Sequence, residues 1–247
     1  MAAAPRIRLD CLGSGFAFSS GRYWNGWLLN GRVLLDCPPQ TLPHLYRLGR
    51  SPADVELVLL SHEHADHVGG MDLFLVDAVH RYPDRARPWA VAGPTGIYER
   101  LREVIGDHRH QPRRDDPRFR WLEDDGGAVF AWAGITVETV RMEHAVPNNG
   151  FRVHIDGGVV AYTGDTAPGP HIAALAAGAD VLIVECGGSG PGMHCDWDDV
   201  IALRRALPPS TEVLVTHYDA TRVPALPPLA GFTLAEDFAV YEYRGAA

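Results

Sequence analysis

Short apolar runs that end in glycine or a polar residue recur along the chain, and helical patterns separate several of them. Such runs span 7–12, 55–61, 89–94, 135–143, 180–186 and 212–217. Their length and their β-branched and leucine content are typical of buried strands. Helical patterns span 41–48, 71–80, 95–105 and 197–207. We expect Asp196 or a neighbour to cap the last helix. This succession of strands and helices is typical of an α/β fold.

Two turn signals add strand pairs to this pattern. Asn30-Gly31 separates the apolar stretch 27–29 from 32–36, and this dipeptide predicts a hairpin. Gly157-Gly158 likewise separates 151–155 from 159–162. In contrast, Gly13-Ser14-Gly15 completes no dinucleotide-binding fingerprint, so we interpret it as a tight turn.

Four potential metal ligands lie within six residues directly after the run 55–61. The stretch reads His62-Glu63-His64-Ala65-Asp66-His67, and the helical pattern 71–80 follows it. The ligands therefore sit on the turn between a strand's carboxyl end and a helix, where α/β folds keep their sites. Neutral imidazoles and carboxylates suit zinc, iron or manganese. A polar surface loop is the alternative, but such a loop does not need convergent ligands.

The motif His-x-His-x-Asp-His after an apolar strand resembles the signature of the metallo-β-lactamase superfamily. Further matches are His144 before Val-Pro, Asp165 in Gly-Asp-Thr, and His217 after a strand and Thr. The resemblance extends over most of the chain and is greatest to the branch of ribonuclease Z and related phosphodiesterases. It implies a four-layer αββα sandwich, with residues 1–247 forming one hydrolase domain.

The resemblance also implies a set of metal ligands. It assigns one divalent ion to His62, His64, His144 and Asp165, and a second ion to Asp66, His67, Asp165 and His217. The ions are expected to be zinc, with manganese or iron as alternatives, and Asp66 is assigned a catalytic role as well. Taken singly, each of the later residues is a weak signal. Together they follow apolar strands in the family's order, which favours a metal site.

Three further residues match positions near the family's active site. Glu185 and His194 match a pair that protonates the leaving oxygen, although Cys186 and Cys195 differ from the family's neighbouring letters. A loop histidine that caps the next helix is the alternative for His194. Asp36 matches an aspartate that supports the metal histidines, a common role for carboxylates; an ordinary strand-end aspartate is equally compatible.

Five aromatic residues cluster after the first strand: Phe16, Phe18, Tyr23, Trp24 and Trp27. They could pack in the core and a hairpin, or form a pocket wall for a substrate that bears a ring. The region 107–120 mixes arginines with aspartates, which is typical of a solvated loop, and phosphate contact is the alternative. We expect His108 and His110 to be exposed there. His44, His80, His154 and His171 carry no motif and are interpreted as structural.

Composition limits the remaining possibilities. The 247 residues are 46% hydrophobic and 21% charged, as in an ordinary soluble protein with one or two domains. The four cysteines form no Cys-x-x-Cys pair, and we find no signal peptide or membrane-spanning run, so we expect free thiols and a cytoplasmic location. A net charge of −9 argues against extended nucleic acid as a partner. A homodimer remains open.

These observations favour one function over several alternatives. We expect a phosphodiesterase that acts on a small or nucleotide-like diester through hydroxide held by two metal ions. About 50 residues separate 93–94 from His144, too few for the long glycine-rich arm of ribonuclease Z. A tRNA 3′-processing endonuclease therefore remains as an alternative, as does a hydrolase of a lactone, thioester or amide. A non-catalytic metal- or nucleic-acid-binding module is a third reading, and redox chemistry of the flavodiiron type is the most remote.

Overall fold

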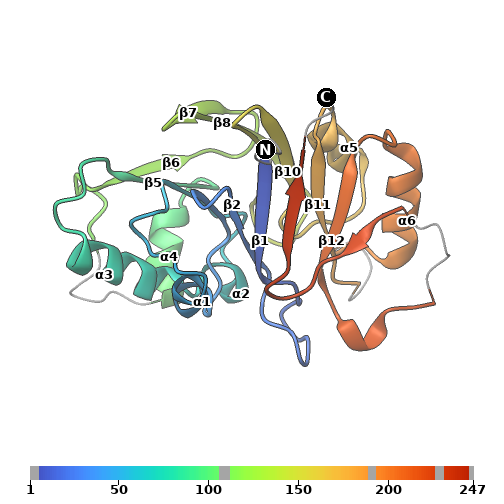
Figure 1. Ribbon diagram of the computed structural model, residues 1–247, viewed down its shortest axis with the longest axis horizontal. Helices are drawn as coiled ribbons and strands as arrows, with labels where there is room; N and C mark the ends of the chain where they lie inside the picture. Colours follow the sequence, from blue (N-terminus) through green and yellow to red (C-terminus); the bar gives the residue numbers. More distant parts are fainter. Residues whose placement is uncertain (1–5, 106–111, 189–192, 226–230, 245–247) are drawn as a thin grey trace, which may run out of the picture.

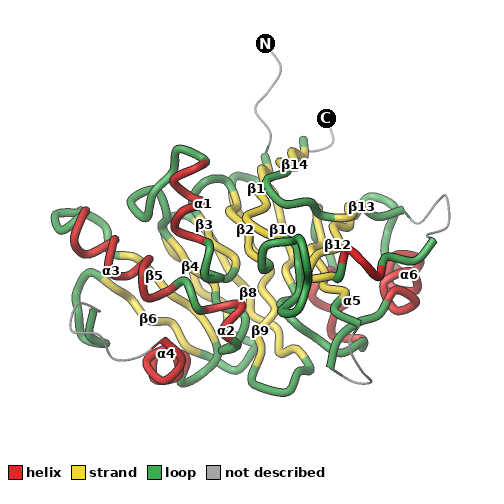
Figure 2. Tube along the Cα trace, turned by 90° about the horizontal axis from the view of Figure 1, so that it is seen from below, coloured by secondary structure: helices red, strands yellow, loops and turns green. Residues whose placement is uncertain are grey.

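The computed structural model describes residues 6–105, 112–188, 193–225 and 231–244, and within these ranges two β-sheets pack face to face with helices outside (Figure 1 and Figure 2). The first sheet contains β1 Ile7–Gly13, β2 Gly26–Leu29, β3 Val33–Leu35, β4 Leu57–Leu59, β5 Trp89–Gly93, β6 Phe119–Glu123 and β14 Val240–Tyr243. The second contains β7 Val129–Trp132, β8 Ile135–Met142, β9 Asn148–Ile155, β10 Gly158–Tyr162, β11 Val181–Cys186, β12 Glu212–Tyr218 and β13 Thr233–Leu234.

The helices fall into two groups, one outside each sheet (Figure 1). The first group is α1 Thr41–Arg47, α2 Ala65–Val68, α3 Met71–Arg81 and α4 Ile97–Ile105, and the second is α5 Pro170–Ala176 and α6 Trp197–Ala206, with a 3₁₀ turn at Ala220–Arg222. Asp196 forms a reciprocal capping box with Asp199 at the start of α6, as expected for its N-cap. None of the helices in the described ranges has the length and apolar composition to cross a bilayer.

Each sheet is antiparallel in one half and parallel in the other. The orders are β14-β1-β2-β3-β4-β5-β6 and β13-β12-β11-β10-β9-β8-β7 in the described residues. From β3 to β6 and from β10 to β13 neighbouring strands run parallel. The Asn30-Gly31 turn joins β2 to β3 as predicted, because both residues adopt the positive φ that this hairpin needs (49° and 68°).

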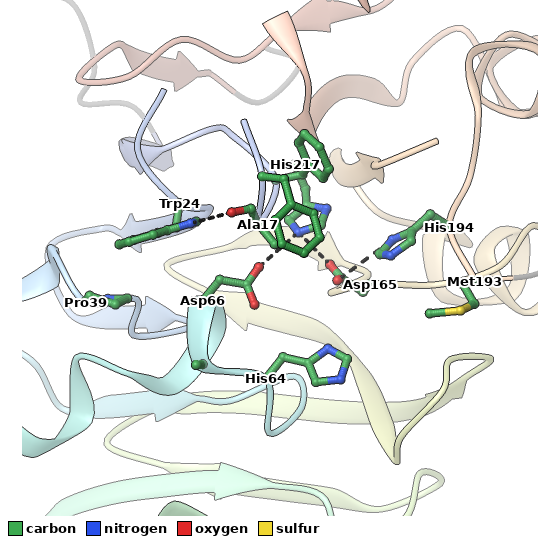
Figure 3. A pocket seen from close by; sticks show the side chains of 12 residues that line it. Ala17, Trp24, Pro39, His64, Asp66, Asp165, Met193, His194 and His217 are labelled. Atoms are coloured by element: carbon green, nitrogen blue, oxygen red, sulfur yellow. Dashed lines mark hydrogen bonds and ion pairs between the residues drawn. The ribbon is translucent and has the colours of Figure 1, made fainter. Parts of the chain in front are cut away.

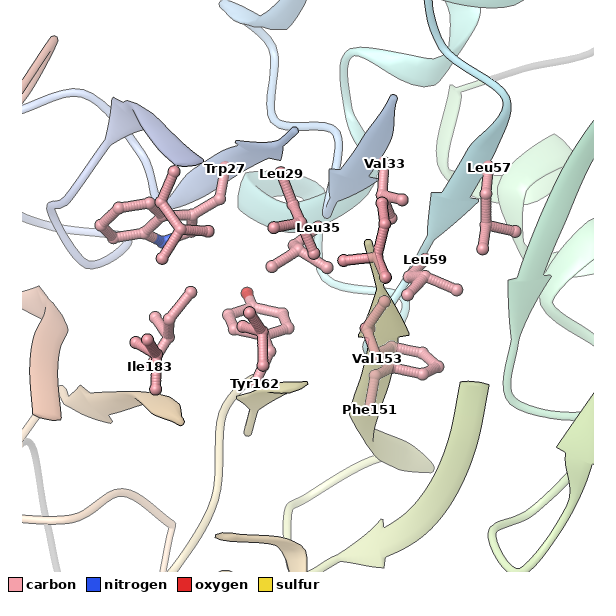
Figure 4. Packing of buried hydrophobic residues seen from close by; sticks show 14 of the residues in the cluster. Trp27, Leu29, Val33, Leu35, Leu57, Leu59, Phe151, Val153, Tyr162 and Ile183 are labelled. Atoms are coloured by element: carbon pink, nitrogen blue, oxygen red, sulfur yellow. The ribbon is translucent and has the colours of Figure 1, made fainter. Parts of the chain in front are cut away.

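Three apolar layers hold the sandwich together. Alternate side chains of each strand point to opposite faces, so Leu29 packs between the sheets while Leu28 packs under the helices of the first sheet. The layer between the sheets contains Trp27 and Tyr162, both fully buried (Figure 4). A third layer lies between the second sheet and α5 and α6. The predicted αββα sandwich is therefore confirmed, whereas the single domain over 1–247 stays a prediction.

The topology gathers several strand ends at one edge. β10, β11 and β12 are parallel neighbours, and β8 points the same way because β9 is antiparallel to both β8 and β10. Their carboxyl ends carry Asp165, Glu185, His217 and His144 in or directly after the strands. The loop after β4 brings the His62–His67 motif to the same edge. The fold thus assembles the predicted residues from five separate segments.

Candidate metal centre

The His62–His67 motif forms the end of a strand loop and a single helical turn. The sequence pattern indicated a turn here, but residues Ala65–Val68 form α2, and His64 takes the N-cap position. Asp66 and His67 therefore project from a helix, while His62 and His64 project from the loop before it. The start of α2 after His64 therefore divides the motif into two pairs of side chains, one on the loop and one on the helix.

The first group of potential ligands is His62, His64, His144 and Asp165, with one donor atom of each lying within 4.8 Å of the others. The Nε2 atom of His62 lies 2.9 Å from Nδ1 of His64, and Nε2 of His144 lies 3.4 Å from that same Nδ1. Burial lowers the pKa of all three histidines below the ordinary value. Neutral imidazoles are the form that ligates metal.

The second group consists of Asp66, His67 and His217, again within 4.8 Å of one another. The Nε2 atom of His67 lies 3.4 Å from Asp66 Oδ2, and Nε2 of His217 lies 3.5 Å from the same oxygen. Burial raises the pKa of Asp66, but His67 and His217 together lower it below its usual range. His217 reaches this position with a positive φ of 51°, a conformation uncommon outside glycine.

Asp165 lies between the two groups. Its Oδ2 is 3.7 Å from His62 Nε2, whereas its Oδ1 is 3.3 Å from His67 Nε2 and 3.4 Å from His217 Nε2. Each carboxylate oxygen thus faces a different group (Figure 3 shows Asp66, Asp165 and His217 turned toward one another). Although burial opposes its charge, His217 and His67 hold the pKa of Asp165 well below the ordinary value. A charged carboxylate in this position can join two cations.

We refer to the residues of the two ligand groups together as the metal cluster. Several buried polar atoms of this cluster lack a hydrogen-bond partner, and they indicate whether metal ions fit the site. Among the described residues, His67 Nε2, His217 Nε2 and Asp165 Oδ1 are buried and have no hydrogen-bond partner. Buried polar atoms are normally paired, so such a convergent set requires an explanation. Metal ligation supplies one, since these are imidazole nitrogens and a carboxylate oxygen of the kind that divalent ions bind. The residues therefore fit divalent metal binding.

A buried carboxylate supports this cluster from behind. Asp36 is fully buried at the end of β3 and accepts hydrogen bonds from Ser61 N at 2.7 Å, Ser61 Oγ at 2.9 Å and the Tyr162 hydroxyl. Its Oδ2 also lies 2.7 Å from His67 Nδ1. The sequence offered Asp36 as a support residue, but it gave no signal for Tyr162, which is 126 positions away.

Glu185 and His194 meet beside the cluster. His194 Nδ1 lies 3.0 Å from Glu185 Oε1, and Glu185 also accepts from the backbone N–H groups of Thr166 at 2.9 Å and Cys195 at 3.2 Å. Burial lowers the pKa of His194, but the hydrogen bond and charge of Glu185 raise it above the ordinary value overall. His194 does not cap α6, because Asp196 does. Part of this loop, 189–192, lies outside the described residues.

The other predicted residues lie in different surroundings. His44 contacts the Leu12 carbonyl, and His154 contacts Glu138. His171, which the sequence marked only as structural, lies 2.8 Å from the hydroxyl of Thr166, the neighbour of Asp165.

His108 and His110 fall outside the described residues. Elsewhere in that region, Arg114 pairs with Glu99 and Glu123, and Arg118 pairs with Asp116, in agreement with a solvated loop. All four cysteines are buried and free.

A pocket of about 690 Å³ opens onto the cluster. Its apolar lining comprises Phe16, Ala17, Phe18, Trp24, Pro39, Ala65 and Met193, and its polar lining comprises His64, Asp66, Asp165, His194 and His217. The aromatic cluster of the sequence therefore divides: Trp27 is in the core, whereas Phe16, Phe18 and Trp24 line the pocket.

Comparisons with known proteins give the same classification. A family model described as "Anti-Pycsar protein Apyc1" matches residues 7–236. Ribonuclease Z of Mycobacterium marinum is 28% identical over 162 residues, which cover 61% of this chain and 58% of that protein. The matched part thus spans less than two thirds of this relative's length.

Two solved structures share the fold. The metallo-β-lactamase fold protein YhfI from Bacillus subtilis superposes with a TM-score of 0.76 at 19% identity, covering 96% of this chain and 99% of YhfI. A diphosphatase from the PhnP family gives a TM-score of 0.74 at 19% identity, covering 96% and 98%. These matches confirm the predicted fold class and branch. The chain belongs to the family described as Anti-Pycsar protein Apyc1, among the ribonuclease Z-like members of the metallo-β-lactamase superfamily.

Proposed function

We propose that this protein is a metal-dependent phosphodiesterase acting on a small, nucleotide-like diester. The observation that carries the proposal is Asp165, whose two oxygens face two separate groups of ligands, with the Glu185–His194 pair beside it. A site for two ions plus a proton donor meets the needs of phosphodiester hydrolysis. The names ribonuclease Z and diphosphatase among similar proteins support a hydrolase of this type.

In this proposal each ligand group holds one divalent ion. His62, His64, His144 and Asp165 would hold the first ion, and Asp66, His67 and His217 the second, with Asp165 added to the second group through its Oδ1. When bound, zinc, or manganese or iron in its place, supplies positive charge to the phosphoryl oxygens and lowers the pKa of water. The protein's own contribution is to hold the ligands on the ends of strands that share the core between the sheets, and on α2, whose Val68 packs in the layer between the first sheet and its helices.

His194 is placed to move the proton. Glu185 lies against Nδ1 of the ring, so Nε2 is the nitrogen left to donate toward a leaving oxygen in the pocket that His194 lines. The raised pKa of His194 favours the protonated ring that such a donor needs. Glu185 is nearly inaccessible, so its role is to orient and charge His194 rather than to contact substrate.

The size and charge of the site favour a small substrate. A pocket of about 690 Å³ is in the range of small-molecule sites. The net charge of −9 opposes a long polyanion. Cleavage of tRNA is the second candidate, and the 28% identity to ribonuclease Z of M. marinum is the observation in its favour.

Hydrolysis assays on the metal-loaded protein test the proposal. We expect turnover of bis-(p-nitrophenyl) phosphate that stops with a chelator, little turnover of an acyl ester, and little cleavage of precursor tRNA. Asp165→Ala should lose metal and activity together. His194→Ala should keep its metal and lose turnover by about 10²–10⁴-fold. His154→Ala is the matched control, since that histidine pairs with Glu138 outside the site. Unchanged diester turnover in His194→Ala would remove the proton donor from the mechanism, and efficient tRNA cleavage would favour the second candidate.

A further inference from the structure

The loop after β1 presents aromatic rings to the pocket. Phe16 is buried, and its ring lies edge-on to His217 with centroids 6.2 Å apart. The ring of Phe18 lies edge-on to Phe16, with centroids 5.8 Å apart. Phe18 is 85% exposed and Trp24 is 38% exposed. An aromatic ring as exposed as Phe18 costs solvation free energy, and a cluster of such rings at a pocket suggests contact with a ligand.

The loop is held in place by one carboxylate from a distant part of the chain. Asp237 Oδ1 accepts hydrogen bonds from Ser14 N at 2.9 Å and Ser14 Oγ at 2.8 Å, and Oδ2 accepts from Tyr23 N at 2.9 Å. Within the loop, Trp24 Nε1 donates to the Ala17 carbonyl at 3.0 Å. These bonds fix both ends of the loop, so the rings present a preorganised surface.

The remaining lining limits the charge of the ligand. The polar residues of the lining are His194 and members of the metal cluster. No lysine or arginine is among the described residues that line the pocket. The nearby Arg22 instead lies within 3.5 Å of Ser14 Oγ and the Ala235 carbonyl. Positive charge for a phosphoryl group would therefore come from ions bound at the metal cluster and from His194 beside it. The rest of the pocket suits an uncharged, apolar group.

We propose that Phe18, with Trp24 beside it on the loop, is a specificity-determining residue that stacks an uncharged planar ring carried by the substrate. The inference rests on the proposed function in one respect, because it places the phosphoryl group of the same ligand at the metal cluster. Ring stacking on an exposed aromatic side chain contributes enough binding to separate ligands that bear a ring from those that do not. The alternative is that the exposed aromatic rings contact a second copy of the chain.

Binding of two phosphonates to the zinc-loaded protein tests this assignment. Phenylphosphonate and methylphosphonate share the charged group and differ in the ring, so the ratio of their dissociation constants measures the contribution of the ring. Calorimetry should give a preference for phenylphosphonate of about tenfold, or ~1.4 kcal/mol. In Phe18→Ala the preference should fall to about twofold or less, and Phe18→Trp should retain it.

Leu73→Ala is the control, since Leu73 is 56% exposed but does not line the pocket, and it should leave the preference unchanged. An equal preference in the wild-type protein and in Phe18→Ala overturns the proposal. So does a change from dimer to monomer in Phe18→Ala without a change in the preference, which would assign the rings to a self-interface. If the preference depends on Phe18 but no phosphodiester is hydrolysed, the proposed function fails while the stacking assignment stands.

Discussion

Replacing Asp36 with asparagine tests how the support behind the metal cluster works. The carboxylate has no exposure to solvent, and its Oδ2 faces three groups: Ser61 Oγ, His67 Nδ1 and the Tyr162 hydroxyl. Its Oδ1 accepts from Ser61 N. Asparagine has one acceptor oxygen and one NH₂ group. In either orientation the NH₂ group must face a donor, so the substitution removes at least one hydrogen bond and the charge on the others.

The magnitude follows from these contacts. A hydrogen bond to a charged group contributes about 1.5–3 kcal/mol, and a charge-assisted bond is roughly twice as strong as a neutral one. Losing one bond and weakening the others should therefore lower the free energy of unfolding by about 3–5 kcal/mol, comparable to breaking a buried ion pair. Asp36 also holds the proton of His67 on Nδ1, which leaves Nε2 free to ligate. Loss of such a partner costs about 10–100-fold in metal affinity.

Two measurements check this prediction. Urea unfolding of the metal-free protein gives the change in stability, and zinc titration against a competing chelator gives the change in affinity. Asp180→Asn is a suitable control, because Asp180 accepts from Val159 N at the opposite end of the second sheet and should leave zinc affinity unchanged. If Asp36→Asn binds zinc as tightly as the wild type, Asp36 does not orient His67 and the reasoning is wrong.

Three further predictions concern the metal, the aromatic loop and the core. Removing metal with a chelator should lower the melting temperature by about 10–30 °C, since each of the two proposed sites filled at 100–1,000 times its dissociation constant adds about 3–4 kcal/mol; calorimetric scans with and without zinc measure the shift. Asp237→Ala should reduce the preference for phenylphosphonate by about fivefold at unchanged zinc affinity, because the loop loses its tether. Trp27→Ala should cost about 3–5 kcal/mol in urea unfolding, since Trp27 is fully buried between the sheets.

Much of the fold follows from local signals in the sequence. The Asn30-Gly31 hairpin forms because only a few residue types accept two successive positive φ angles. The helix over Met71–Arg81 and the capped helix from Trp197 likewise match their patterns. The residues predicted to ligate metal lie together for a related reason: each follows an apolar strand, and the ends of parallel strands meet at one edge.

The features that sequence reasoning missed depend on long-range contacts or on very short elements. α2 has four residues, too few for a helical period to register. β13 and β14 form through pairing with β12 and β1, and their own residues give little signal. The contacts of Tyr162 with Asp36 and of Asp237 with Ser14 join residues more than 120 positions apart. Such pairs carry no local pattern, so only the folded chain reveals them.

The charges of the centre support the proposed pair of ions. Asp36, Asp66, Asp165 and Glu185 bring four carboxylates into and behind the cluster, and three of them are almost fully buried. His194, whose pKa is raised, pairs with Glu185. The histidines that would ligate metal in this proposal are neutral when they do so, so they cannot balance the other three carboxylates, and unbalanced buried charge is strongly destabilising. The three remaining carboxylates carry more negative charge than one divalent ion balances, and this favours the second proposed ion. In the same proposal, bound ions would provide the positive charge that attracts a phosphodiester to a pocket whose described lining contains no arginine.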